Sequence, residues 1–315
     1  MKHRAMALTR AQFMRATLAA SVALTLGQGA CAAAATPANA AGGTMLKRKI
    51  PTTGELLPIV GCGTWLGFGH APGSVEYARL PGVIDALFDA GGTVLDSSPM
   101  YGRSETTTGE LLAKSQHRGK AFLATKVWTS GRDAGIRQME ASFKLLGAQK
   151  LDLMQVHNLV DWKTHLQTLR AWKAEGRIRY IGITHYTPSA FREVEAVLRS
   201  EPLDFLQINY AYDDQAAAER LLPLAADKGV AVLVNQPFGG GGLLRGLRDR
   251  PLPGWAREID CTSWAQVLLK FVLSQPAVTC VIPGTSRPEH MADNAKAGQG
   301  VMPDAAFWRQ RSISI

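Results

Sequence analysis

The sequence predicts a (β/α)8 barrel, an α/β fold, preceded by a β-hairpin. From Leu46 onward, eight short apolar runs rich in Val and Ile alternate with amphipathic stretches. Such continuous runs are typical of parallel strands covered on both faces, and eight strand–helix units in about 270 residues match this barrel's usual size. A doubly wound open sheet is the alternative. It would usually show G-x-G-x-x-G after the first strand, but the stretch 61–67 has no third glycine in register.

Each candidate strand is a short apolar run. The eight runs are Ile59–Gly61, Thr93–Asp96, Phe122–Val127, Leu151–Val156, Tyr180–Ile183, Phe205–Ile208, Val230–Val234 and Val278–Ile282. Ahead of them, Lys47 to Pro58 predicts the extra hairpin, with its turn at Thr53-Gly54.

Helical periodicity is clearest in two of the segments between the strands. Residues 162–172 and 264–272 each keep their apolar side chains on one helical face. Pro223 is expected to kink or break the sixth helix, because proline lacks the N–H that a helix interior needs. Ser286 and Glu289 have capping-box spacing ahead of the last helix.

Residues 1–40 have the pattern of a signal peptide, and residues 41–315 are assigned to the barrel. A basic start precedes an apolar run, Leu18 to Leu26, which is too short to span a bilayer, and Ala38-Asn39-Ala40 offers a cleavage site. Thr9 to Arg15 resembles the bacterial twin-arginine export motif, with Ala11 in place of its second arginine. We expect export to the periplasm, and a cytoplasmic location is the alternative.

Composition excludes several classes of function. The net charge of +9 is spread without a basic run, which argues against nucleic-acid binding. None of the four cysteines forms a C-x-x-C, so a zinc ribbon or a thioredoxin-type dithiol is not expected. H-x-H and H-E-x-x-H are absent, which argues against a metal-dependent hydrolase.

Four side chains follow the ends of successive predicted strands. Asp96, Lys126 and His157 end strands two, three and four, and Tyr101 lies in the loop after Asp96. Chemistry in such a barrel sits where the strands end. We expect Asp96 to hold Lys126, whose ammonium lowers the pKa of the Tyr101 phenol, while His157 donates to a substrate oxygen. With a source of hydride, this arrangement reduces a carbonyl, and Tyr101 is the general acid.

The chain resembles the aldo/keto reductase family from Leu46 to Ala297. Four segments carry the resemblance. The first is residues 92–112, which contains Asp96 and the sequence Tyr101-Gly102-Arg103-Ser104-Glu105. The others are Ala124-Thr125-Lys126, residues 151–157 and residues 282–294. The resemblance implies a barrel that binds NADPH without a Rossmann fold, with NADH as the alternative. It also implies the tetrad Asp96, Tyr101, Lys126 and His157. We further expect a small carbonyl substrate, a monomer and no stable membrane insertion.

The resemblance also implies which residues bind the cofactor. These are Gly63, Thr64, Trp65, Thr184, His185, Gln207, Asn235, Pro237, Phe238, Gly239, Gly240, Gly284, Thr285, Arg287, His290 and Asn294. Asn235 stands where the family usually has an aromatic ring that stacks on the nicotinamide, and Thr184-His185 replaces the frequent Ser-Asn. Four residues are expected to line the substrate pocket, namely Trp65, Met100, Trp128 and Asn158.

Two functions fit this pattern. The first is an NADPH-dependent carbonyl reductase that uses the tetrad. The second is a nucleotide-binding sensor or regulatory barrel with little turnover, which the loss of the stacking aromatic at Asn235 favours.

Overall fold

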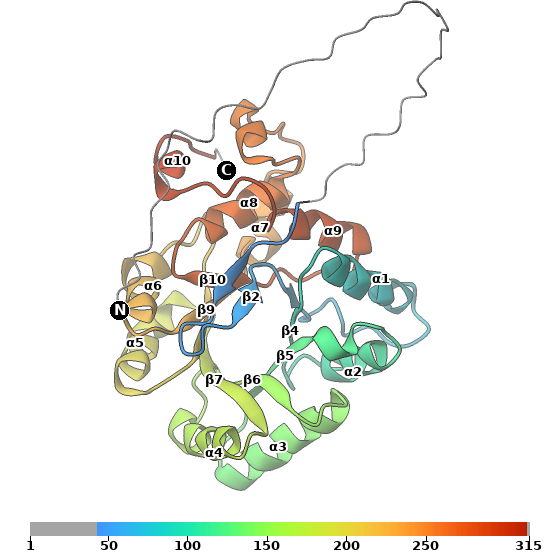
Figure 1. Cartoon of the computed structure of the whole chain (residues 1–315), viewed down its shortest axis with the longest axis vertical. Coiled ribbons are helices and arrows are strands. Elements are labelled where there is room, and N and C mark those ends of the chain that lie inside the picture. The colour runs from blue at the N-terminus through green and yellow to red at the C-terminus, as the bar shows by residue number, and fades with distance from the viewer. Residues whose placement is uncertain (1–42, 314–315) are drawn as a thin grey trace, which may run out of the picture. The chain divides into compact units, whose positions relative to one another are not determined.

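The structure is a computed structural model that describes residues 43–313. The predicted signal peptide and its twin-arginine-like motif therefore lie outside the described residues. The main sheet contains eight parallel strands that follow one another in chain order (Figure 1). They are β3 (Cys62–Gly63), β4 (Val94–Asp96), β5 (Phe122–Val127), β6 (Leu151–His157), β7 (Ile178–Thr184), β8 (Phe205–Asn209), β9 (Ala231–Asn235) and β10 (Val278–Val281). Parallel bridges Val60–Val281 and Gly63–Gly284 join the first and last strands, so the predicted barrel is confirmed.

The first barrel strand begins later than the sequence pattern indicates. Ile59–Gly61 makes only a bridge with β10: Val281 N–H donates to the Ile59 carbonyl, and Gly61 N–H donates to the Val281 carbonyl, each at 2.9 Å. The ladder with β4 starts at Cys62, opposite Leu95. The expected strand was therefore misplaced, because the residues before Cys62 have a paired neighbour on one side only.

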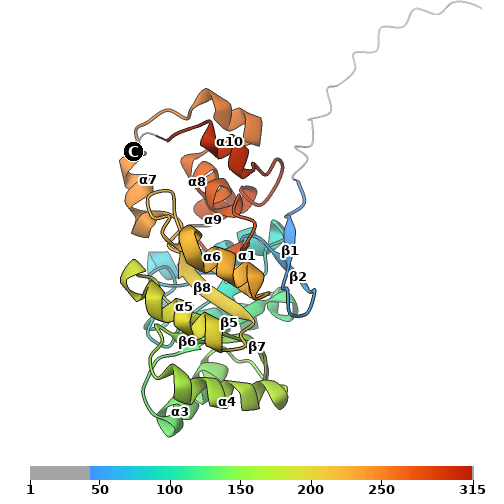
Figure 2. The ribbon, with the colours of Figure 1, turned by 90° about the vertical axis from the view of Figure 1, so that its left-hand side faces the viewer.

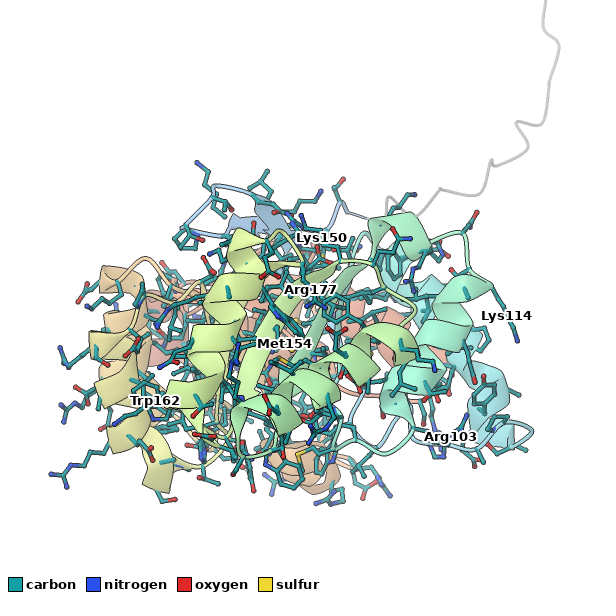
Figure 3. The ribbon with its side chains drawn as sticks, turned by 90° about the horizontal axis from the view of Figure 1, so that it is seen from below. Arg103, Lys114, Lys150, Met154, Trp162 and Arg177 are labelled. Carbon is teal, nitrogen blue, oxygen red and sulfur yellow. The ribbon has the colours of Figure 1, made fainter. Side chains whose placement is uncertain are left out.

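Helices surround the strands. Their bounds are α1 (Val75–Asp89), α2 (Ser104–Ala113), α3 (Arg132–Leu145), α4 (Trp162–Ala174), α5 (Phe191–Ser200), α6 (Ala217–Asp227), α7 (Gly242–Gly246), α8 (Trp264–Leu273), α9 (Pro288–Lys296) and α10 (Ala305–Arg309). Short 3-10 turns lie between some of them, at η1 (Arg118–Lys120), η2 (Pro188–Ala190), η3 (Gly239–Gly241) and η4 (Gly254–Ile259). α1 packs against α9, which joins the two ends of the helical ring. Figure 3 shows α3 and α4 over the outer face of the barrel, with Met154 of β6 beneath them.

Two local signals in the helices do not act as breaks or caps. Pro223 does not break its helix, because α6 runs as one element from Ala217 to Asp227, with Leu221 and Leu224 buried; a kink there stays a prediction. This packing offsets the loss of one backbone hydrogen bond. The capping box at Ser286 does not form either, because α9 begins at Pro288 and its N-cap is Arg287, one residue after Ser286.

The predicted hairpin is present at one end of the barrel. β1 (Lys47–Lys49) pairs antiparallel with β2 (Leu56–Pro58), and Gly54 in the turn has a φ of +76°, a conformation that glycine adopts without strain. Ile50 and Leu57 of the hairpin join the core inside the barrel. Figure 2 shows the hairpin and α7 on opposite sides of the strands. The hairpin thus closes one end and leaves the other for a site.

Side chains inside the barrel change from apolar to polar along the strands, from the hairpin end to the carboxyl ends. Since neighbouring residues of a strand point to opposite faces, every second side chain enters the barrel. Near the hairpin these are apolar, such as Val94, Phe122 and Phe205. Two or four residues further along the same strands stand Asp96, Lys126 and Gln207, all buried. The carboxyl ends of the strands therefore carry a buried polar layer above an apolar one.

Candidate active site

Asp96 and Lys126 form a buried ion pair at the carboxyl ends of β4 and β5. Lys126 Nζ lies 2.6 Å from Oδ2 of Asp96 and 2.6 Å from the carbonyl oxygen of Ser97, and the Lys126 side chain is fully buried. Burial lowers the pKa of the ammonium, but Asp96 and Tyr101 outweigh it, so the net pKa of Lys126 is raised. Lys126 is therefore a cation at neutral pH, as the sequence analysis expects.

Two glutamines complete the contacts of Asp96. Gln155 Nε2 and Gln207 Nε2 donate to Oδ1 of Asp96 at 3.2 and 2.9 Å. Sequence analysis did not single out Gln155, which lies two residues before His157 on the same inward face of β6. Gln207 was assigned to the cofactor; its amide nitrogen holds Asp96, and its Oε1 accepts from Thr184 Oγ1 at 3.3 Å.

Tyr101 lies beside this ion pair, with its ring centroid 5.1 Å from Lys126 Nζ. Burial raises the pKa of the phenol, and the opposing effect of Lys126 does not cancel it. The ammonium acts in the expected direction and lowers the pKa, but the net pKa is raised, because desolvation of the phenolate has the larger effect. Tyr101 is a protonated phenol at neutral pH.

His157 meets Tyr101 edge to face, with ring centroids 5.9 Å apart. Burial, and then the positive charge of Lys126 and the proximity of His185, lower the pKa of His157 to about 3. The imidazole is therefore neutral at pH 7, so it can donate one hydrogen bond without carrying charge. Its Nδ1 lies 3.1 Å from Oγ of Ser98, a buried residue that sequence analysis did not single out.

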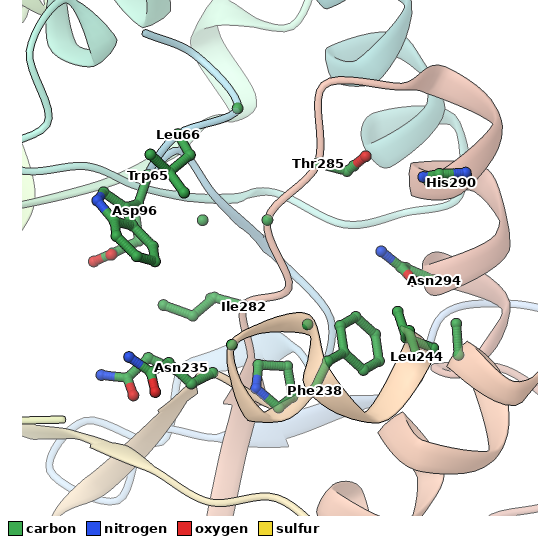
Figure 4. A pocket seen from close by; sticks show the side chains of 18 of the residues that line it. Trp65, Leu66, Asp96, Asn235, Phe238, Leu244, Ile282, Thr285, His290 and Asn294 are labelled. Atoms are coloured by element: carbon green, nitrogen blue, oxygen red, sulfur yellow. The ribbon is translucent and has the colours of Figure 1, made fainter. Parts of the chain in front are cut away.

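A cavity of about 940 Å³ opens at this end of the barrel (Figure 4). Of the predicted site residues, those that line it are Gly63, Trp65, Asp96, Met100, Tyr101, His157, Asn158, Thr184, Gln207, Asn235, Pro237, Phe238, Gly240, Gly284, Thr285, Arg287, His290 and Asn294. In Figure 4, Asp96 and Asn235 lie at one end, and Thr285, His290 and Asn294 at the other. The tetrad therefore occupies one end of an elongated cavity.

Five predicted site residues lie next to the cavity without lining it. Lys126 is buried beneath it. Thr64 is also buried and donates to Ser97 Oγ at 3.0 Å. The ring of Trp128 lies 6.4 Å from that of His157. Nδ1 of His185 accepts from Tyr186 N–H at 3.0 Å, and Gly239 packs close to the Asp213 carboxylate. Their assigned roles stay predictions.

The cavity is also lined by two cations that sequence analysis left out. Arg245 of α7 and Arg248 line the cavity together with the predicted Arg287. The three glycines of η3 precede α7, with φ between +56° and +88°, so the chain turns there through conformations that favour glycine. A side-chain atom at Gly241 would lie 3.1 Å from Nη1 of Arg245. The glycine run in the sequence is the signal that could have directed attention to Arg245.

Some classes of site are not seen. Within residues 43–313, no group of three or more His, Cys, Asp or Glu side chains has the arrangement of a metal site. No helix in the same range combines the length and the hydropathy needed to cross a membrane. Cys62, Cys261 and Cys280 are buried free thiols, and burial raises the pKa of each.

The barrel and its cavity, together with the family match that follows, place the chain among NAD(P)H-dependent oxidoreductases. Residues 59–315 match the model of the aldo/keto reductase family, so the chain belongs to that family.

Three relatives illustrate the range of the family. The chain is 28% identical to the methylglyoxal reductase YeaE of Escherichia coli, over 80% of this chain and 89% of that protein. It is 27% identical to an NADH-specific methylglyoxal reductase of the same organism, over 85% and 98%. The structure of a Klebsiella pneumoniae aldo/keto reductase in complex with NADP and acetate matches with a TM-score of 0.69 at 25% identity, over 82% of this chain and 91% of that one.

Proposed function

We propose that this protein reduces an aldehyde or ketone to an alcohol with NADPH, and that Tyr101 supplies the proton. The observation that carries the proposal is the placement of a protonated phenol and a neutral imidazole at one end of the cavity. A buried ammonium lies behind the phenol. Such donors act on an oxygen that gains negative charge during a reaction.

The residues of the cavity fit a phosphorylated dinucleotide. Arg245, Arg248 and Arg287 line the cavity, where they can pair with phosphate oxygens. In the described part of the chain, Oδ1 of Asn235 is buried without a hydrogen-bond partner, which leaves an acceptor for a polar ligand in the cavity wall. The Klebsiella relative holds NADP, which favours NADPH, whereas the NADH-specific relative keeps NADH as the alternative.

When bound, the nicotinamide supplies the hydride, and the protein supplies the remaining groups. His157 donates a hydrogen bond to the carbonyl oxygen and stabilises the charge that develops there. Tyr101 transfers its proton to that oxygen, and the Lys126 ammonium, held by Asp96, stabilises the phenolate that remains. The carboxylate therefore acts through Lys126 and does not need to reach the substrate.

The walls near Tyr101 favour a small, uncharged carbonyl compound. Trp65, Leu66 and Met100 are exposed apolar side chains that line this part of the cavity. Two curated relatives are methylglyoxal reductases, so we propose α-dicarbonyl compounds as the first substrates to test, beside simple aldehydes and ketones.

The test measures NADPH oxidation by the purified protein against a panel of aldehydes, ketones and α-dicarbonyls. Tyr101→Phe is assayed in parallel, with cofactor binding followed by fluorescence. Turnover in the native protein that disappears in the variant, with cofactor binding unchanged, supports the proposal. Tight NADPH binding without turnover on any carbonyl contradicts it and favours the sensor or regulatory function.

A further inference from the structure

We propose that Ser98 is a positioning residue that keeps the proton of the His157 ring on Nε2. The proposal rests on the proposed function, in which His157 donates a hydrogen bond to the substrate oxygen. Ser98 lies in the loop between β4 and Tyr101, is fully buried, and places its Oγ 3.1 Å from Nδ1 of His157. Nε2 is then the ring nitrogen left to face a ligand in the cavity that His157 lines.

The direction of this hydrogen bond follows from the acceptors available to the buried Ser98 hydroxyl. Its other contact is with a donor, the backbone N–H of Met100, at 3.4 Å. Among the described residues, Nδ1 of His157 is the only acceptor within hydrogen-bond distance of Ser98 Oγ, so the hydroxyl donates to it. A ring nitrogen that accepts carries no proton, so a neutral ring must carry its proton on Nε2.

The tautomer matters because the ring has a single proton. Burial lowers the pKa of His157 to about 3, so the imidazolium, which would donate from both nitrogens, is not populated at pH 7. A neutral ring with its proton on Nδ1 would turn a lone pair toward the substrate oxygen and repel the developing charge. Fixing the proton on Nε2 is therefore a requirement for His157 to act as a donor.

The same turn also fixes the backbone at Tyr101. Tyr101 N–H donates to the carbonyl oxygen of Ser98 at 3.0 Å, so one residue contacts both the His157 ring and the backbone of Tyr101.

The first experiment measures the tautomer directly, by NMR of protein labelled with 15N in the imidazole rings, at pH 7. A protonated and an unprotonated ring nitrogen resonate at well separated frequencies, and His157→Gln identifies the signals of His157. We expect the native protein and Ser98→Thr to show a protonated Nε2, and Ser98→Ala to show a mixture of tautomers. Ser142→Ala removes another fully buried hydroxyl, which donates to the Gln138 carbonyl oxygen within α3 and does not line the cavity, and is the matched control.

The second experiment measures kinetics of the same variants. Ser98→Ala should lower kcat about 10- to 100-fold, the range found when the hydrogen-bond partner that orients a metal-binding histidine is lost. The affinity for NADPH should stay within about twofold, Ser98→Thr should restore kcat, and Ser142→Ala should leave it unchanged. If Ser98→Ala does not fold, Ser98→Cys, with its weaker S–H donor, should give an intermediate tautomer population and an intermediate kcat.

A proton on Nδ1 in the native protein, or an unchanged tautomer in Ser98→Ala, overturns this proposal. The NMR measurement needs no turnover, so it tests the role of Ser98 equally well if no carbonyl is reduced. Absence of turnover with a protonated Nε2 that depends on Ser98 would contradict the proposed function and leave the positioning role intact.

Discussion

Lys126 Nζ lies 2.6 Å from Oδ2 of Asp96 inside the barrel, and both side chains are buried. The two charges come from neighbouring parallel strands, β4 and β5, at positions that both point inward. A buried pair of this kind is costly to break, because the remaining charge has neither a partner nor water. The pair consequently supports both the stability of the barrel and the charge beside Tyr101.

Asp96→Asn is expected to destabilise the protein by about 3–5 kcal/mol, since it leaves the Lys126 ammonium buried without its counter-charge. The free energy of unfolding in urea measures this loss. Asp96→Asn combined with Lys126→Met should recover part of the stability. As a control, Arg103→Ala removes an exposed ion pair with Glu110 and should cost less than about 1 kcal/mol. If Asp96→Asn lowered the free energy of unfolding by less than about 1 kcal/mol, it would contradict a buried ion pair between Asp96 and Lys126.

Tyr101→Phe is expected to lower kcat by about 10²- to 10⁴-fold, the usual contribution of a positioned general acid. The affinity for NADPH should change little, because the phenol acts on the substrate oxygen. NADPH oxidation and a fluorescence titration measure the two quantities. Wild-type rates in the variant would show that another group delivers the proton.

The raised pKa of Tyr101 predicts how the rate depends on pH. Burial keeps the phenol protonated above its ordinary pKa of about 10. Because His157 stays neutral down to about pH 3, neither group titrates between pH 5 and 8. The rate of reduction, plotted against pH, should therefore show no change between pH 5 and 8 that is due to Tyr101 or His157. A step in the native protein that disappears in His157→Gln would contradict this assignment.

The lowered pKa of His157 predicts an effect on stability in acid. The unfolded imidazole binds a proton below about pH 6.5, whereas the folded one does so only near pH 3. The unfolded state therefore binds more protons in this window, and stability falls as the pH drops from about 6.5 toward 3. His157 contributes up to about 1.4 kcal/mol per pH unit. Urea unfolding at pH 7, 5.5 and 4.5 should show a shallower fall for His157→Gln, and equal slopes would contradict the shift.

Arg287→Ala is expected to weaken NADPH binding on the order of tenfold, the scale of one charge-assisted hydrogen bond. NADH lacks the 2′-phosphate and should lose little. Fluorescence titration measures the dissociation constants of NADPH and NADH for the native protein and the variant, and the factor by which each one rises is compared. Equal losses for the two cofactors would show that Arg287 does not contact the 2′-phosphate, and Arg245→Ala would then be the next variant to measure.

Much of this fold follows from local pattern. The apolar runs locate seven of the eight barrel strands, since strands covered on both faces need continuous apolar sequence. The hairpin follows from the turn at Gly54, whose φ of +76° suits glycine. Errors occurred where a neighbour outweighed the local signal: β3 begins at Cys62, where its pairing with β4 begins, and α6 continues through Pro223 because its leucines are buried.

By itself, the sequence determined the order of the elements. It also predicted that Asp96, Tyr101, Lys126 and His157 lie together, because strand ends converge in a parallel barrel and the spacing of a motif can be read directly from the sequence. Only the tertiary structure decided the direction of the Tyr101 pKa shift, the contact of Ser98 with His157, and the approach of Arg245 to the cavity. Desolvation depends on everything packed around a group, and hydrogen bonds between distant segments depend on distances of a few ångströms. Neither quantity is encoded in the spacing of residues along one chain.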